Sequence, residues 1–225
     1  MKPMSERHFE VMRRHMVEMI AIHMDLMSDE IGAGDLDERL VAALLEVPRH
    51  RFVPAPLAPL AYHDTPLPIG FDKTISQPFI AALMIELLAP RPGGSVLEVG
   101  TGLGYQAAIL ARLAGRVWSV EIVEEFAQAA KARLDESGLA NVAIRVGDGS
   151  RGWPEHAPFD RILVTAAAPG LPEPLVEQLA VGGRMVIPIG PAEAQRLALV
   201  VKHSDERTEV REVLPVRFTQ LETDP

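Results

Sequence analysis

A glycine-rich turn carries the strongest chemical signal in the sequence. Residues 98–105 read Glu-Val-Gly-Thr-Gly-Leu-Gly-Tyr and fall between a predicted strand and a predicted helix. The glycines Gly100, Gly102 and Gly104 let the chain turn sharply and let a ligand approach the backbone. A dinucleotide fingerprint would need its third glycine where Tyr105 stands. The spacing therefore argues against NAD and against a pyrophosphate at the helix start.

Acidic residues follow the next two predicted strands. Glu121 comes 21 positions after Gly100, where a carboxylate can accept hydrogen bonds from both hydroxyls of a ribose. Asp148 and Gly149 follow the third strand, where a carboxylate can accept from an adenine amino group while a glycine leaves room for the ring. Together with the glycine turn, and without a phosphate pocket, these residues indicate S-adenosylmethionine. The simpler alternative is a set of ordinary strand-end turns, because a single Gly-x-Gly is a weak signal.

Short apolar strands that alternate with helices position this turn. Such alternation predicts an α/β fold, a Rossmann-like, mostly parallel sheet covered on both faces. Two final strands without a helix between them predict a closing antiparallel pair. The expected strands are residues 95–99, 116–120, 141–146, 159–167, 182–190, 195–203 and 212–218, and the expected helices begin near residues 105, 121 and 174.

The first 78 residues have a different pattern and predict a cap of helices and extended chain. Apolar residues at three- and four-residue steps predict amphipathic helices over residues 8–28 and 37–45. Six prolines over residues 48–68 exclude a long helix or central strand, so an extended strap is expected, followed by a loop over residues 70–78 and a helix over 79–88. We expect one domain over residues 1–225, with residues 79–225 as the cofactor-binding core.

Composition narrows the class of function. The chain has 225 residues, 48% hydrophobic and 24% charged, as in an average soluble protein, and its formal net charge of -9 disfavours a nucleic-acid partner. The absence of cysteine excludes disulfides and thiol nucleophiles. His15 and His23 are eight residues apart and lack a third ligand nearby, so no metal site is expected. No apolar stretch approaches the length of a membrane span, and the charged amino terminus is unlike a signal peptide, which predicts a cytoplasmic protein without a membrane partner.

Several segments make the sequence similar to the protein-L-isoaspartate (D-aspartate) O-methyltransferases, a family of protein repair enzymes. The most specific of them is the Thr-Ile-Ser-Gln-Pro motif at residues 74–78. The resemblance extends from about Leu40 to Phe218, over VPRHRFVP (47–54), LPIGFDKTISQP (67–78), VLEVGTGLGYQAA (96–108), GDGSRGW (147–153), APFDRILVTAA (157–167) and QLAVGGRMVIPIG (178–190).

This resemblance implies an S-adenosylmethionine-dependent enzyme that methylates the carboxylate of L-isoaspartyl and D-aspartyl residues in damaged proteins. It implies that Ser76 is the active-site hydroxyl, that isoaspartyl proteins and peptides are the substrates, and that the enzyme is a monomer without a metal. The residues implied to line or hold the cofactor site are Thr74, Ile75, Gly100, Thr101, Gly102, Gly104, Glu121, Asp148 and Gly149.

Three departures from the family pattern leave other functions open. Leu103 stands where serine is common, residues 71–73 replace a loop usually rich in Gly, His and Gln, and residues 219–221 read Thr-Gln-Leu where relatives continue Val-Pro-Leu. A related O-methyltransferase acting on an aspartyl carboxylate of a dedicated biosynthetic peptide, or on another carboxylate, would keep the fold and the cofactor. A non-catalytic cofactor-binding adaptor is the third alternative, and the presence of Ser76 argues against it.

Overall fold

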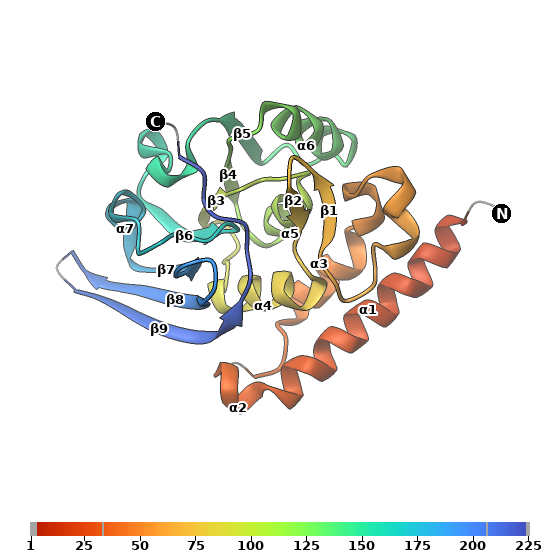
Figure 1. The fold of residues 1–225 in the computed structure, drawn as a ribbon, viewed down its shortest axis with the longest axis horizontal. Helices are drawn as coiled ribbons and strands as arrows, with labels where there is room; N and C mark the ends of the chain where they lie inside the picture. Colours follow the sequence, from red (N-terminus) through yellow and green to blue (C-terminus); the bar gives the residue numbers. More distant parts are fainter. Residues whose placement is uncertain (1–3, 33, 206, 224–225) are drawn as a thin grey trace.

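A mostly parallel sheet forms the centre of the protein (Figure 1). The structure is a computed structural model that describes residues 4–32, 34–205 and 207–223. Within those residues, seven strands form the main sheet. In spatial order they are β5 (Val142–Val146), β4 (Arg116–Glu121), β3 (Ser95–Val99), β6 (Phe159–Val164), β7 (Leu179–Ile189), β8 (Gln195–Ser204) and β9 (Arg207–Val216).

The direction of the strands follows the predicted pattern. The five strands β3 to β7 pair in parallel, and β8 and β9 continue the sheet antiparallel from β7. The central strands β3 and β6 are buried along nearly their whole length, as parallel strands covered on both faces must be. These observations confirm the predicted fold class and the closing antiparallel pair.

The two faces of the sheet are covered unequally. Helices α4 (Pro78–Leu88), α5 (Tyr105–Leu113) and α6 (Glu124–Glu136) cover one face, and α1 (Glu6–Leu26) and α3 (Glu38–Glu46) pack outside α4 and α5 in the same core (Figure 1). Helix α7 (Glu173–Gln178) and a loop that contains Trp153 cover the other face. The core on the α4–α5 side is therefore much the larger of the two.

The N-terminal segment differs from the prediction in two places. The proline-rich strap is not extended throughout, because residues Arg49–Phe52 and Ala55–Leu60 form short 3-10 helices, the second with proline in its first turn. The end of the strap and the expected loop over residues 70–78 together form a hairpin of β1 (Leu67–Gly70) and β2 (Lys73–Ile75). Its two turn residues, Phe71 and Asp72, have positive φ angles of 49° and 55°, the conformation of a tight hairpin turn.

The helices among the described residues are too short or too polar to cross a membrane. Helix α2 (Ser28–Ile31) is a single turn.

Candidate active site

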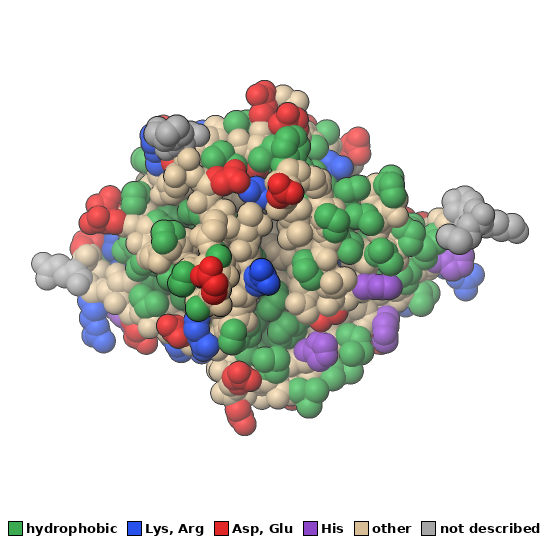
Figure 2. Space-filling view, in the orientation of Figure 1, with side chains coloured by type: hydrophobic (Ala, Val, Ile, Leu, Met, Phe, Trp, Pro, Cys, Tyr) green, Lys and Arg blue, Asp and Glu red, His purple; other side chains and the backbone are tan. Residues whose placement is uncertain are grey.

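A cavity of about 500 Å³ opens at the carboxyl ends of the parallel strands. The strand order reverses between β3 and β6, and ligands of α/β proteins bind at such a switch point. Its volume lies within the roughly 300–1,000 Å³ of small-molecule sites. Figure 2 shows this face of the molecule hollowed near its centre, with acidic and basic side chains around the hollow. The walls come from the hairpin, the glycine turn, the ends of β3, β4 and β6, and the C-terminal tail, which we define as residues 217–222.

The glycine turn forms the floor of the cavity through Gly100 and Gly102. Both have positive φ angles, 91° and 55°. A Cβ atom on Gly100 would lie 2.3 Å from the Thr165 hydroxyl oxygen, and that hydroxyl donates to the carbonyl of Gly100 at 2.7 Å. The backbone is therefore held close to β6, and its conformation at this point requires glycine.

Glu121 lies at the end of β4 and lines the cavity. One carboxylate oxygen accepts from the backbone N–H of Gly102 at 2.7 Å, and the other accepts from that of Val123 at 3.0 Å. Burial raises the pKa of Glu121, while these backbone donors and the charge of Lys73 act in the opposite direction. Each carboxylate oxygen keeps a further lone pair, so the group can still accept bonds from a pair of hydroxyls.

Ser76 is placed where β2 ends and α4 begins, and it lines the cavity together with Thr74. Among the described residues, none forms a hydrogen bond with the Ser76 hydroxyl, which leaves it available to a ligand. Ile75 and Thr101 line a smaller hollow of about 50 Å³, which shares Ser76, Gly100 and Gly102 with the main cavity. The structure thus brings the hairpin residues and the glycine turn together around one space.

Two of the expected cofactor residues do not line this space. Gly104 is the N-cap residue of α5 and faces α6, where a Cβ atom on Gly104 would lie 3.2 Å from that of Ala130. The Asp148 carboxylate accepts from the Ser150 N–H at 2.9 Å and lies 3.3 Å from Arg151. Its neighbour Gly149 does line the cavity. Cofactor binding by Asp148 and Gly104 stays a prediction.

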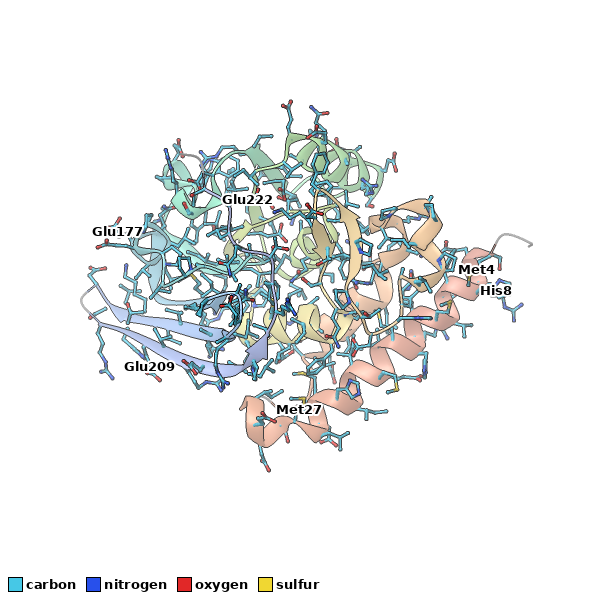
Figure 3. All side chains as sticks on the ribbon, viewed as in Figure 1. Met4, His8, Met27, Glu177, Glu209 and Glu222 are labelled. Atoms are coloured by element: carbon cyan, nitrogen blue, oxygen red, sulfur yellow. The ribbon has the colours of Figure 1, made fainter. Side chains whose placement is uncertain are left out.

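Sequence reasoning missed Thr165 and the contact of Lys73 with the tail, whereas it singled out residues 219–221 of the tail as a departure from the family pattern. Thr165 follows β6 directly, so the rule that strand ends carry ligand contacts would have found it. Lys73 lies on the hairpin, and its amino group forms an ion pair with Glu222 of the tail, which Figure 3 labels. The tail itself follows β9 past the strand ends, where Ala167 exchanges backbone hydrogen bonds with its residues (Figure 1). No local pattern connects these segments, because they are far apart in the sequence.

A buried polar chain lies beneath the glycine turn. The Thr101 and Ser119 hydroxyl oxygens are 2.5 Å apart, and the Ser119 hydroxyl donates to Glu98 at 2.5 Å. Glu98 is fully buried in β3. Burial raises the pKa of Glu98 to about 8, so this carboxyl is largely protonated at neutral pH.

Trp153, His156 and His23 contact other side chains of the fold and do not line the cavity. Trp153 packs edge to face against Trp118 at 5.3 Å between ring centroids. His156 stacks on Trp118 at 3.4 Å between ring centroids. His23 lies 3.7 Å from Asp64. In residues 4–32, 34–205 and 207–223, no group of three His, Asp or Glu residues could hold a metal ion.

Comparison with known sequences identifies relatives over nearly the whole chain. A family model described as Protein-L-isoaspartate(D-aspartate) O-methyltransferase (PCMT) matches residues 21–224. Protein-L-isoaspartate O-methyltransferase 1 of Polaromonas sp. (strain JS666) is 52% identical over 219 residues, 97% of this chain and 93% of the relative. Protein-L-isoaspartate O-methyltransferase of Anaeromyxobacter dehalogenans (strain 2CP-C) is 57% identical over 190 residues, 84% of this chain and 91% of the relative.

Solved structures share the fold. A protein-L-isoaspartate O-methyltransferase superposes with a TM-score of 0.79 at 30% identity, over 92% of this chain, and this chain spans 65% of its length. A putative protein-L-isoaspartate O-methyltransferase from Plasmodium falciparum, in complex with S-adenosyl-L-homocysteine, superposes with a TM-score of 0.77 at 24% identity, over 94% of this chain and 99% of that one.

Proposed function

The chain belongs to the protein-L-isoaspartate(D-aspartate) O-methyltransferase family, and on that premise we propose that it transfers a methyl group from S-adenosylmethionine to the free carboxylate of isoaspartyl residues in damaged proteins, D-aspartyl residues included. The observation that carries the proposal is the cavity in which the Ser76 hydroxyl and the glycine turn share one space. Methyl esterification starts the repair of the damaged residue.

The cavity fits the cofactor in shape and in chemistry. A Cβ atom on Gly100 would lie 2.3 Å from the Thr165 hydroxyl oxygen and one on Gly149 would lie 2.4 Å from Val99, so both positions in the cavity wall pack against side chains of the sheet and leave no room for a larger residue. We assign Gly100, Gly102 and Glu121 to the cofactor, with Thr74, Ile75, Thr101 and Gly149 beside them. The adenine contact of Asp148 and the role of Gly104 belong to the same proposal. When bound, S-adenosylmethionine supplies a methyl group on a positively charged sulfur, and S-adenosylhomocysteine is the product.

The substrate carboxylate needs no strong base. A carboxyl group with a pKa near 4 is already ionised at pH 7, and among the described residues that line the cavity there is no histidine. What the protein must supply is orientation and exclusion of water. The Ser76 hydroxyl can donate to one carboxylate oxygen and so hold the other toward the methyl group. Ser76 is therefore the group for which we propose a catalytic role.

The test compares two peptides that differ at one linkage. The protein is incubated with S-adenosylmethionine labelled in its methyl group and with an isoaspartyl peptide, and in parallel with the same sequence containing normal aspartate. We expect label in a base-labile ester on the isoaspartyl peptide alone. Equal labelling of both peptides, or of neither, would contradict the repair activity.

A second candidate function rests on the tail. Thr219, Gln220 and Leu221, which depart from the family pattern, all line the cavity. A substrate range that includes an aspartyl carboxylate of a biosynthetic peptide therefore stays an alternative, and labelling of the normal aspartyl peptide would favour it. The net charge of -9 supports a protein rather than a nucleic-acid substrate. Action as a monomer, in the cytoplasm and without a membrane partner, belongs to the same proposal, and light scattering tests the monomer.

A further inference from the structure

A buried arginine lies behind the proposed active-site serine. Arg49 belongs to the 3-10 helix at the start of the strap and is 0% exposed. Its Nε donates to the carbonyl of Ala61 at 2.7 Å, and one terminal nitrogen donates to the carbonyl of Ser76 at 2.6 Å. The guanidinium lies 4.9 Å from the centre of the Tyr105 ring. Arg49 therefore contacts the strap, the end of the hairpin and the first residue of α5.

The contact with Ser76 is unusual because of where Ser76 lies. It is the residue between β2 and the N-cap of α4, so neither the hairpin ladder nor the helix supplies a donor to its carbonyl. Within the described chain, Arg49 is the donor that this carbonyl has. On the other side of the turn, Asp64 accepts from the Gln77 amide at 2.8 Å and from the Phe79 N–H at 2.9 Å. The turn that carries the hydroxyl is thus held from two sides.

Burying the Arg49 cation to provide hydrogen-bond donors for two carbonyls costs free energy. A buried cation loses its hydration, and burial lowers the pKa of Arg49 from its ordinary value. Among the described residues it forms no ion pair with a carboxylate, and its second terminal nitrogen is buried without a hydrogen-bond partner. The planar guanidinium can bond two carbonyls in fixed directions while stacking on an aromatic ring, and no other side chain combines these properties.

We propose that Arg49 is a positioning residue, which sets the backbone of Ser76 against the start of α5 and thereby fixes the Ser76 hydroxyl relative to the glycine turn. The inference rests on the proposed role of Ser76. The Tyr105 ring is the surface against which Arg49 is fixed. Tyr105 follows Gly104 of the glycine turn directly and is itself only 3% exposed. A shift of about 1 Å at a reacting group can cost on the order of a hundredfold in rate. Arg49 would act through Ser76 and would not touch the substrate.

The test is a double-mutant cycle between Arg49 and Ser76, measured on the full chain. In Arg49→Lys, the cation remains but the fork that bonds both carbonyls is lost. We expect kcat to fall about tenfold to a hundredfold, with little change in the binding of S-adenosylhomocysteine by calorimetry. In the Ser76→Ala background the same change should have no further effect on kcat, because the hydroxyl that Arg49 positions is absent.

Arg161 provides the matched control. It is 3% exposed and also donates to two backbone carbonyls, those of Ala89 at 2.9 Å and Asp160 at 2.7 Å, near the start of β6 and away from the cavity. Arg161→Lys should lower the unfolding temperature and leave kcat unchanged. Arg49→Gln, which keeps an amide donor without a buried charge, serves as a second variant should Arg49→Lys fail to fold.

The outcomes separate the inference from the proposed function. An Arg49 variant that keeps wild-type kcat, or that lowers kcat equally with and without the Ser76 hydroxyl, would overturn the positioning role. If Ser76→Ala alone leaves turnover unchanged, the catalytic role of Ser76 fails, whatever the Arg49 variants do. A loss of kcat in Arg161→Lys equal to that in Arg49→Lys would mean that both act through stability alone.

Discussion

At the scale of single residues, Ser76 and Glu121 line the same cavity in different surroundings. The Ser76 hydroxyl has no hydrogen-bond partner among the described residues, whereas Glu121 accepts two backbone hydrogen bonds, one of them from Gly102 of the glycine turn. A hydroxyl without a partner in the protein is suited to bonding a substrate that binds and dissociates in each turnover. A carboxylate held by the turn is suited to a ligand that lies on the turn.

We therefore expect the two residues to affect different constants. Glu121→Ala should weaken binding of S-adenosylhomocysteine about tenfold to a hundredfold, because hydrogen bonds to a charged group contribute about 1.5–3 kcal/mol. Ser76→Ala should lower kcat about tenfold to a hundredfold with that binding retained. Calorimetry and steady-state kinetics on both variants check the assignment. The reverse pattern would mean that the two roles are wrongly assigned.

Glu98 should make stability depend on pH. Burial raises its pKa from 4.5 to about 8. Between these two values the folded state keeps a proton that the unfolded state has released, so the free energy of unfolding falls as pH rises, by about 1.4 kcal/mol per pH unit for a full proton. Glu98→Gln has no such proton and retains an oxygen that can accept from Ser119.

The measurement is the difference in unfolding temperature between wild type and Glu98→Gln. From pH 5 to pH 8 the wild type should lose stability relative to the variant, while groups common to both cancel. Parallel pH curves for the two proteins would show that Glu98 is ionised in the folded state. The comparison does not depend on activity.

At the scale of elements, the hairpin and the tail are connected at the cavity wall by the ion pair of Lys73 and Glu222. The Glu222 side chain is 55% exposed, so the pair contributes little to stability. Its charges still act on an anionic substrate. Glu222→Gln leaves the Lys73 charge uncompensated and should lower KM for an isoaspartyl peptide about two- to fivefold, whereas Lys73→Met should raise KM by a similar factor.

Salt distinguishes charge from shape in that comparison. Screening shortens from about 8 Å at 0.15 M to about 3 Å at 1 M ionic strength, so both KM effects should shrink at high salt. The charge of Lys73 also opposes the rise in the pKa of Glu121 that burial causes, so the affinity for S-adenosylhomocysteine is measured in both variants to separate an effect on the cofactor from an effect on the peptide. KM changes of the same sign in both variants would show that the contact matters as a tie between the segments and not through its charges.

The elements that sequence patterns predict well are those whose pattern is local. Strands such as Ser95–Val99 were predicted to the residue, because a short apolar run bounded by glycine and proline has few other structures. The hairpin was missed because Phe71 and Asp72 occupy its turn, where Asn-Gly is the usual signal. The prolines of the strap exclude a long helix, as the sequence predicts, but they do not exclude short 3-10 helices, because proline is common at the start of a helix.

The residues of the site show the same contrast between local patterns and contacts across the fold. The glycine turn and Glu121 follow strands, and the sequence predicts their place from the rule that ligands bind at strand ends. Lys73 and Glu222 are 149 positions apart, and Arg49 is 27 positions from Ser76. Such contacts depend on how the strap and the tail cross the folded sheet. The periodicity of the sequence does not predict that crossing.

At the scale of the whole molecule, the cavity joins the parts of the chain that the sequence separates. Its wall takes residues from the first 78 positions, from the α/β core and from the tail. One hydrophobic core runs from Met16 in α1 through α4 and α5 to Leu214 in β9. That residues 1–225 form a single domain stays a prediction, and from it we expect a ligand in the cavity to stabilise all parts together.

Ligand binding should therefore raise the temperature of a single cooperative unfolding transition. At a free concentration of about 100 times its Kd, S-adenosylhomocysteine should add about 2.7 kcal/mol to the free energy of unfolding, which for a chain of this length corresponds to about 5–10 °C in unfolding temperature. Calorimetry checks this, and Glu121→Ala at the same ligand concentration is the control, because its weaker binding should reduce the shift. Two transitions, with only the later one moved by ligand, would mean that the N-terminal cap unfolds independently of the core and that the single-domain prediction is wrong.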